Sequence, residues 1–266
     1  MKSRITEKFN KLKKENKKAL IPYITSGDPD LDTTVNLVLE LERAGADIVE
    51  LGISYSDPIG DGPVIQRSTQ RALELGTNID KIFPMVSKTR ANTDIPLVFL
   101  VYYNAIFVYG IKKFLDRCKE VGIDGLIIPD LALEERKELN EMMNEYPIDL
   151  ISLVAPTSEN RIKEIVENAK GFVYCISSKG VTGVRDQFEE DISSFMDKIK
   201  KYTDIPLAIG FGISDENAIK KLKGLSDGLI VGSAIIKKIE EGIDDRKVEE
   251  KVFNFAKKLK NAIEED

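Results

Sequence analysis

Eight short apolar runs, each separated from the next by a longer amphipathic segment, restrict the fold of this 266-residue chain more than any other feature. The runs are apolar on both faces, as parallel strands are when helices cover them. They span Ala19–Ile24, Asp47–Leu51, Leu97–Val101, Gly125–Ile128, Leu150–Val154, Phe172–Ile176, Leu207–Ile209 and Gly228–Val231. Since an eightfold α/β barrel takes ~250 residues, the alternation predicts one (β/α)₈ barrel, a TIM barrel, with residues 1–266 forming a single catalytic domain.

The segments between the runs carry helix signals. Leu31, Val35 and Val38 recur at intervals of four and three, so they share one face of a helix. Two further helices are expected outside the regular repeat. Residues 3–17 predict an added N-terminal helix over the bottom of the barrel, and residues 76–92 predict an additional helix before the third strand.

An open, doubly wound sheet is the rival architecture. That fold usually carries a glycine-rich fingerprint, G-x-G-x-x-G, after its first strand. Here the turn at Thr25–Pro29 reads Thr-Ser-Gly-Asp-Pro and lacks it. The pentapeptide Thr-Asp-Ile-Pro-Leu occurs at Thr93–Leu97 and again at Thr203–Leu207, which favours a barrel built from repeated βα units.

Composition excludes several classes of function. The chain has no histidine, which rules out Ser-His-Asp and Cys-His catalysis and histidine-ligated zinc. A net charge of −6 argues against nucleic acid as the main partner. No apolar run approaches the ~20 residues of a membrane span, and no secretory signal is seen. Cys118 and Cys175 are far apart and are expected to be free, buried thiols in a reducing cytoplasm, with no metal site.

Two carboxylates belong to the second βα unit, where a barrel would place its active site. Glu50 lies between Val49 and Leu51, and burial would raise its pKa into the range useful for acid–base work. A structural ion pair, or a position at the barrel rim, is the alternative for this residue. Asp61 stands between two glycines in the next loop, where it could simply cap a turn, as could Asp57. Together, Glu50 and Asp61 would supply general acid–base catalysis without histidine.

Glycine-rich loops follow the last three strands, at Ser177–Gly183, Gly210–Ser214 and Gly232–Ala234. Glycines serve ordinary turns equally well, but three such loops at one end of a barrel expose backbone N–H groups to an anion. The third loop is expected to open a short helix over Ile235–Glu240, and a helix start favours negative charge. These loops predict a phosphate site that needs no metal.

At these residues the sequence resembles the tryptophan synthase alpha chain family over essentially its whole length. The matching stretches are Pro22–Pro29, Glu50–Pro58, Asp61–Gln66, Tyr102–Asn104, Gly180–Gly183, Gly210–Ile213 and Gly232–Ile235. The run Glu-Leu-Gly, Ser-Asp-Pro, Asp-Gly-Pro is specific to this family, whereas the glycine loops are shared with other phosphate-binding barrels. The resemblance implies retro-aldol cleavage of indole-3-glycerol phosphate to indole and glyceraldehyde 3-phosphate, within tryptophan biosynthesis.

The resemblance also implies roles for individual residues. Glu50 matches the family's catalytic acid and base, and Asp61 matches the carboxylate that binds the indole N–H. Tyr174 matches an active-site tyrosine, although an inward-facing barrel aromatic would read the same way. Tyr23 and Leu100 match walls of the indole pocket. The phosphate cradle would comprise Thr182, Gly183, Gly210, Gly212, Gly232 and Ser233.

Family members work with a pyridoxal-phosphate-dependent beta chain in an α₂β₂ heterotetramer, so the resemblance implies that partner and no cofactor on this chain. The expected contact residues are Ser54, Tyr55, Asp57, Pro58 and Asn104. The chain departs from the family pattern at Ser54, Tyr55, Val64, Ala105 and Ala132, which concerns docking and loop closure more than chemistry. Two other hypotheses stay open: another phosphate-binding barrel of histidine or tryptophan biosynthesis, and a non-catalytic barrel that activates a partner.

Overall fold

Nine parallel strands form the sheet in the computed structural model, which describes residues 3–58, 60–131, 133–176, 185–210 and 212–265, with the backbone alone over 185–191. The strands are β1 (Ala19–Thr25), β2 (Val49–Gly52), β3 (Leu97–Leu100), β4 (Gly125–Ile127), β5 (Asp149–Leu150), β6 (Ser152–Val154), β7 (Val173–Cys175), β8 (Leu207–Ile209) and β9 (Gly228–Val231). Their spatial order is β5-β4-β3-β2-β1-β9-β8-β7-β6. All eight predicted strands are therefore present, with ends within two residues of those expected.

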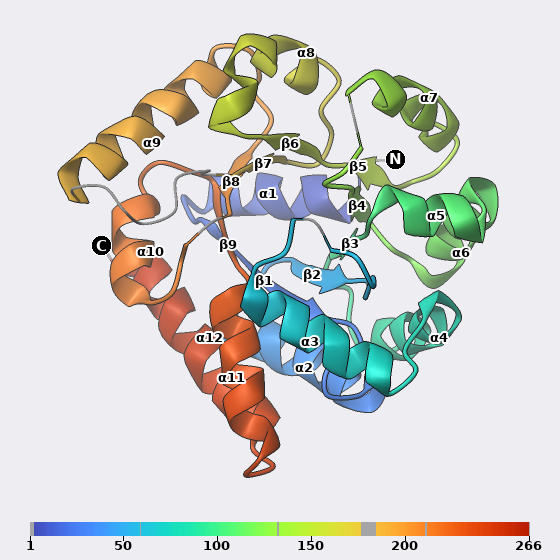
Figure 1. Cartoon of the computed structure of the whole chain (residues 1–266). Helices are drawn as coiled ribbons and strands as arrows, with labels where there is room; N and C mark the ends of the chain where they lie inside the picture. Colours follow the sequence, from blue (N-terminus) through green and yellow to red (C-terminus); the bar gives the residue numbers. More distant parts are fainter. Residues whose placement is uncertain (1–2, 59, 132, 177–184, 211, 266) are drawn as a thin grey trace.

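The sheet closes because the two strands at the ends of this order are neighbours in the chain. β5 and β6 are halves of the strand predicted as one piece, with only Ile151 between them. β5 pairs with β4, and β6 pairs with β7. The chain bends at Ile151 to reach both partners, and the Ile151 N–H still donates to the Leu126 carbonyl at 2.9 Å. The barrel is thus nearly complete, and the predicted (β/α)₈ architecture is confirmed (Figure 1).

Helices surround the barrel in the part of the chain that the structure describes (Figure 1). They are α1 (Arg4–Lys14), α2 (Leu31–Ala44), α3 (Pro63–Glu74), α4 (Ile79–Arg90), α5 (Tyr103–Tyr109), α6 (Ile111–Val121), α7 (Leu133–Met143), the 3₁₀ turn η1 (Pro156–Arg161), α8 (Ile162–Val166), α9 (Arg185–Lys200), α10 (Glu216–Leu222), α11 (Ser233–Ile243) and α12 (Val248–Glu264). The two additional helices expected from the sequence are α1 and α4, whereas α5 was not anticipated. Among the described residues, no helix combines the length and apolar character needed to cross a membrane.

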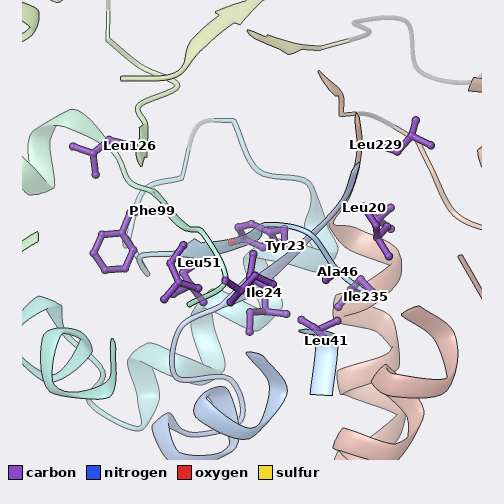
Figure 2. Close-up of a cluster of buried hydrophobic side chains, with 14 of the residues drawn as sticks. Leu20, Tyr23, Ile24, Leu41, Ala46, Leu51, Phe99, Leu126, Leu229 and Ile235 are labelled. Carbon is purple, nitrogen blue, oxygen red and sulfur yellow. The ribbon is translucent and has the colours of Figure 1, made fainter. Parts of the chain in front are cut away.

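Strand side chains alternate between two hydrophobic layers. Those that point outward pack against the surrounding helices, as Leu20, Ile24 and Leu51 do in Figure 2. Those that point inward at the amino end of the barrel join Ile5, Phe9 and Leu12 of α1 in a second cluster. The N-terminal helix therefore closes the bottom of the barrel, as predicted, and leaves the carboxyl end of the strands as the open end.

Aspartates connect neighbouring strands at the bottom of the barrel in two turns of the form Gly-x-Asp, Gly45–Asp47 and Gly122–Asp124. The Asp47 carboxylate accepts a hydrogen bond from the Leu20 N–H at 3.0 Å, and Asp124 accepts one from the Leu97 N–H at 2.9 Å. Lys260 of α12 also contacts Asp47, with Nζ 2.8 Å from Oδ2. These turns join neighbouring βα units at the amino end of the barrel.

Candidate active site

Glu50 projects from β2 into the barrel interior. Its side chain is buried, at 1% exposure, because strand alternation places it on the same inward face as Ile48. Its Oε2 atom has no hydrogen-bond partner among the described residues, and no cation pairs with it there. Burial, with a smaller contribution from the Asp61 carboxylate, raises the Glu50 pKa to about 8. The structural ion pair considered from the sequence is therefore absent from the described residues.

The loop between β2 and α3 places Asp61 close enough to Glu50 for the two carboxyl groups to interact electrostatically. Asp61 is half-buried, and burial raises its pKa, although a hydrogen bond with Tyr102 opposes this shift. Tyr102 is itself buried, and its hydroxyl accepts a hydrogen bond from the Gly60 N–H at 3.0 Å. Tyr102 therefore contacts two consecutive residues of the loop that carries Asp61. The sequence interpretation gave Tyr102 no role, and its position directly after the third strand was the available signal.

Two tyrosines close the space beside Glu50. The Tyr23 ring lies over Gly52, where an added Cβ would stand only 2.1 Å from the tyrosine hydroxyl oxygen. The Tyr174 ring lies over Gly210, where an added Cβ would stand 2.3 Å from a ring carbon. Both rings thus require glycine at the carboxyl end of the neighbouring strand, within β2 at Gly52 and directly after β8 at Gly210. Burial raises the pKa of each tyrosine, with further contributions from the Glu50 and Asp61 charges, so both hydroxyls stay protonated.

The structure brings Tyr23, Glu50, Asp61 and Tyr174 together at the open end of the barrel. Figure 2 shows the Tyr23 ring at the end of β1, beside the apolar side chains of the barrel wall. Leu100, the last residue of β3, is half-buried and packs against both hydrophobic clusters. These neighbours form a site with apolar and aromatic walls that contains two carboxyl groups.

The helix after β9 begins at the end of the barrel where an anion site was predicted. α11 begins at Ser233, and the preceding Gly232 offers no side chain to cap its first N–H groups. The predicted helix over Ile235–Glu240 was too short at both ends: the observed helix covers Ser233–Ile243, because its apolar face continues to pack against the core. Gly232 is half-buried and Ser233 exposed, so the N–H groups at this helix start can receive an anion.

The remaining cradle residues fall in two groups. Gly210 is the first residue after β8. Gly212 has a φ of +69°, a left-handed conformation that glycine adopts without strain. Thr182 and Gly183 lie outside the described residues, as does the Ala132 departure. Among the described residues, no group of His, Cys, Asp or Glu side chains could hold a metal ion.

Comparison with known proteins matches this geometry to a family. The model of the tryptophan synthase alpha chain family matches residues 9–264. The chain is 60% identical over 257 residues to the tryptophan synthase alpha chain of Alkaliphilus metalliredigens, with 97% of each chain covered. It belongs to the tryptophan synthase alpha chain family. The alpha chain of Thermoanaerobacter pseudethanolicus is 56% identical over 261 residues, covering 98% of this chain and 100% of that one.

The fold agrees with that assignment. A crystal structure of tryptophan synthase subunit alpha from Legionella pneumophila superposes with a TM-score of 0.92 at 32% identity, over 99% of each chain. As a tryptophan synthase alpha chain, the protein is a lyase that carries out the alpha half-reaction of tryptophan biosynthesis. The alternative of a different phosphate-binding barrel is thereby set aside.

The residues expected at the partner contact gather beside the active-site loop. The Asn104 side-chain amide donates to the Tyr55 hydroxyl at 2.8 Å, and the Tyr55 ring stacks on Tyr102 with centroids 5.3 Å apart. Asp57 is exposed and Pro58 half-buried, while the Ser54 hydroxyl is buried without a partner among the described residues. The loop that carries Asp61 and the start of α5 therefore share one surface through these tyrosines. That surface carries the residues predicted for the partner contact.

Proposed function

We propose that Glu50 and Asp61 carry out the cleavage of indole-3-glycerol phosphate, with Glu50 acting first as an acid and then as a base. A pKa of about 8 means that Glu50 holds its proton at neutral pH. It donates this proton to the indole carbon that bears the glycerol phosphate side chain. Asp61 accepts a hydrogen bond from the indole N–H and stabilises the positive charge that develops on the ring.

The second step returns the proton. The Glu50 carboxylate, now ionised, takes the proton from the side-chain hydroxyl next to the ring as the carbon–carbon bond breaks. The electrons of that bond restore the aromatic indole, and the hydroxyl carbon becomes the aldehyde of glyceraldehyde 3-phosphate. Glu50 thus ends the cycle as it began. The observation that carries this proposal is a buried carboxyl group with an elevated pKa beside a second carboxyl group in one pocket.

The remaining residues would bind the substrate at its two ends. Tyr23 and Leu100 line the indole end in this proposal, with Tyr174 across from Glu50. The phosphate would be held by N–H groups at Gly212, Gly232 and Ser233, together with Gly210, Thr182 and Gly183 from the preceding loops. The uncapped start of α11 supports this assignment, since a helix start attracts anions.

Further parts of the proposal concern the molecule in its cell. The whole chain, residues 1–266, would act as one cytoplasmic catalytic domain, a location that the two free, buried cysteines suit. Its partner would be a tryptophan synthase beta chain in an α₂β₂ assembly, with pyridoxal phosphate only on that partner. Cell fractionation and the mass of the complex purified with a beta chain test these points.

Substitution of each carboxyl group tests the mechanism. Glu50→Gln and Asp61→Asn should each lower kcat for indole release by roughly 10²–10⁴-fold, the usual contribution of general acid–base catalysis. Glu42→Gln, at an exposed position of α2, is the matched control and should turn over normally. Assays run with and without a beta chain distinguish the proposed catalytic role from the hypothesis of a non-catalytic barrel that activates a partner. Wild-type turnover by either variant at saturating substrate would reject the assigned role.

A further inference from the structure

A network of charged side chains joins three elements behind the active site. Asp28, in the loop after β1, is fully buried and is held by Arg71 of α3 through two bonds, Nε–Oδ1 at 2.8 Å and Nη2–Oδ2 at 2.7 Å. The remaining arm of the same guanidinium, Nη1, reaches Glu240 of α11 at 2.8 Å. Ser68 of α3 also donates to Asp28. One arginine therefore links the β1 loop, α3 and α11.

The two helices joined in this way each begin beside one half of the proposed substrate site. α3 starts two residues after Asp61, and α11 starts at Ser233, where the phosphate would bind. Figure 1 shows α3 beside α11, and both contact β1. A Cβ added at Gly232 would lie 3.7 Å from Tyr23 and 3.9 Å from Ile65 of α3. The first turns of the two helices therefore converge on the site itself.

Arg71 is suited to fix this arrangement. A guanidinium that binds a carboxylate through two parallel hydrogen bonds fixes the orientation of the two groups as well as the distance between them. Arg67, one turn earlier on α3, also binds Glu240, but its side chain is 54% exposed and no bond joins it to Asp28. Among the residues that the structure describes, only Arg71 therefore connects α11 to the buried aspartate that anchors α3 against the barrel.

We propose that Arg71, with Asp28 and Glu240, is a positioning unit that sets the separation between Asp61 and the phosphate-binding start of α11. The substrate joins its ring to its phosphate through a chain of only three carbons, which limits how far apart the two can lie. The separation between Asp61 and α11 therefore decides whether a ring held near Asp61 and a phosphate held at α11 can be bound at once. The unit selects substrates by length and touches neither end of them. This inference rests on the proposed function, because it takes both half-sites as given.

The test compares Glu240→Gln with Glu241→Gln. Both remove one negative charge from adjacent positions of α11, but the Glu241 side chain bonds only Lys238 of its own helix among the described residues. The measured quantities are kcat and KM for indole-3-glycerol phosphate, and separate dissociation constants for indole and for inorganic phosphate. Since misplacement of about 1 Å can cost a hundredfold in rate, Glu240→Gln should lower kcat/KM by about 5–100-fold while both fragment affinities stay within about twofold of wild type. Glu241→Gln should match wild type in every measurement.

Two outcomes would overturn the proposal. In one, Glu240→Gln and Glu241→Gln give the same kcat/KM. In the other, the loss in kcat/KM is matched by an equal loss of phosphate affinity, which would mean that the network only shapes the cradle. Neither result touches the proposed function, which fails instead if Asp61→Asn turns over normally.

A second pair of variants guards against a folding defect. Arg71→Lys keeps the charge but loses the planar fork, and Arg67→Lys is its control on the same helix. Arg71→Lys should lower kcat/KM with both fragment affinities preserved, and its effect should be less than additive with Glu240→Gln because both act on one network. Additive effects, or an Arg71→Lys variant equal to Arg67→Lys, would contradict the positioning role. Circular dichroism confirms that each variant is folded.

Discussion

The Glu50 side chain is a carboxyl group inside a hydrophobic barrel, with an oxygen that has no partner among the described residues. Burying a carboxylate without a counterion costs free energy. The folded protein therefore keeps Glu50 protonated at a pH where a carboxyl group in water would be ionised. The same strand that makes Glu50 buried also makes it reactive. The raised pKa of Glu50 should therefore affect both the stability of the fold and the pH dependence of the activity.

Stability should depend on pH through Glu50. Its folded-state pKa of about 8 lies above the ordinary value of 4.5, so its contribution to folding is complete below about pH 4.5 and is lost as pH rises through 8. The free energy of unfolding of wild type, relative to Glu50→Gln, should fall by roughly 3–5 kcal/mol over that range. Urea unfolding followed by circular dichroism at several pH values measures it. Parallel pH curves for the two proteins would contradict the prediction, and Glu42→Gln should follow wild type.

Activity should show a bell-shaped dependence on pH. The acid role of Glu50 is lost as pH rises through about 8, so kcat/KM should fall on the alkaline side. Asp61 must be ionised, and its raised pKa brings a second fall on the acid side. The alkaline limb should disappear from the residual activity of Glu50→Gln. An unchanged limb in that variant would assign the titration to another group.

At the scale of elements, helix α1 closes the bottom of the barrel. Phe9 packs against Phe172, with ring centroids 5.8 Å apart, and Ile5 and Leu12 complete the contact. A barrel whose lower interior is filled by a helix does not depend on large strand side chains there, and Ala19 and Ala208 are indeed small. The closure is remote from the open end where Asp61 and α11 lie.

Removal of the Phe9 ring should therefore separate stability from catalysis. Phe9→Ala should cost about 3–5 kcal/mol of unfolding free energy, the usual loss for a buried aromatic side chain. Lys13→Ala, at an exposed position of the same helix, should stay within about 0.5 kcal/mol of wild type. Both variants should keep wild-type kcat below their unfolding transitions. A large loss of kcat in folded Phe9→Ala would show that the two ends of the barrel are coupled.

At the scale of the whole molecule, the two ends of the barrel present different surfaces. Phe107 and Val108 of α5 are large hydrophobic side chains, exposed by 64% and 77%, beside Asn104 at the active-site end. Tyr202, exposed by 52%, precedes β8 and so lies at the amino end. An exposed apolar pair of this kind is typical of a protein contact, which fits the proposed beta-chain partner.

A charge placed on that pair should weaken the complex. Val108→Asp should lower affinity for a beta chain by about tenfold or more, because a carboxylate would be buried in an apolar contact. Its activity without the partner should equal that of wild type. Tyr202→Asp is the control at the opposite end and should bind normally. Calorimetric titration with the beta chain measures both, and equal affinities would place the contact elsewhere.

Local patterns were sufficient to predict the architecture. Apolar runs with helices between them predicted all eight barrel strands, and the expected helices before the first and third strands are present. Glu50 was recognised because a glutamate inside an apolar strand is unusual. By contrast, α5 and the role of Tyr102 were missed, since a seven-residue helix has little periodicity and a buried tyrosine resembles any other core aromatic.

What the sequence determined by itself was the order of strands and helices and the identity of the acidic and glycine-rich loops, because these depend on residues close together in the chain. Only the tertiary structure decided that the strand at Ile151 divides between two partners, that Tyr102 holds the Asp61 loop, and that Arg71 joins Asp28 to Glu240. Asp28 and Glu240 stand 212 positions apart by their numbers in the chain, 240 minus 28. Closure of the barrel brings both carboxylates within hydrogen-bond distance of Arg71, and no local pattern of residues encodes that proximity.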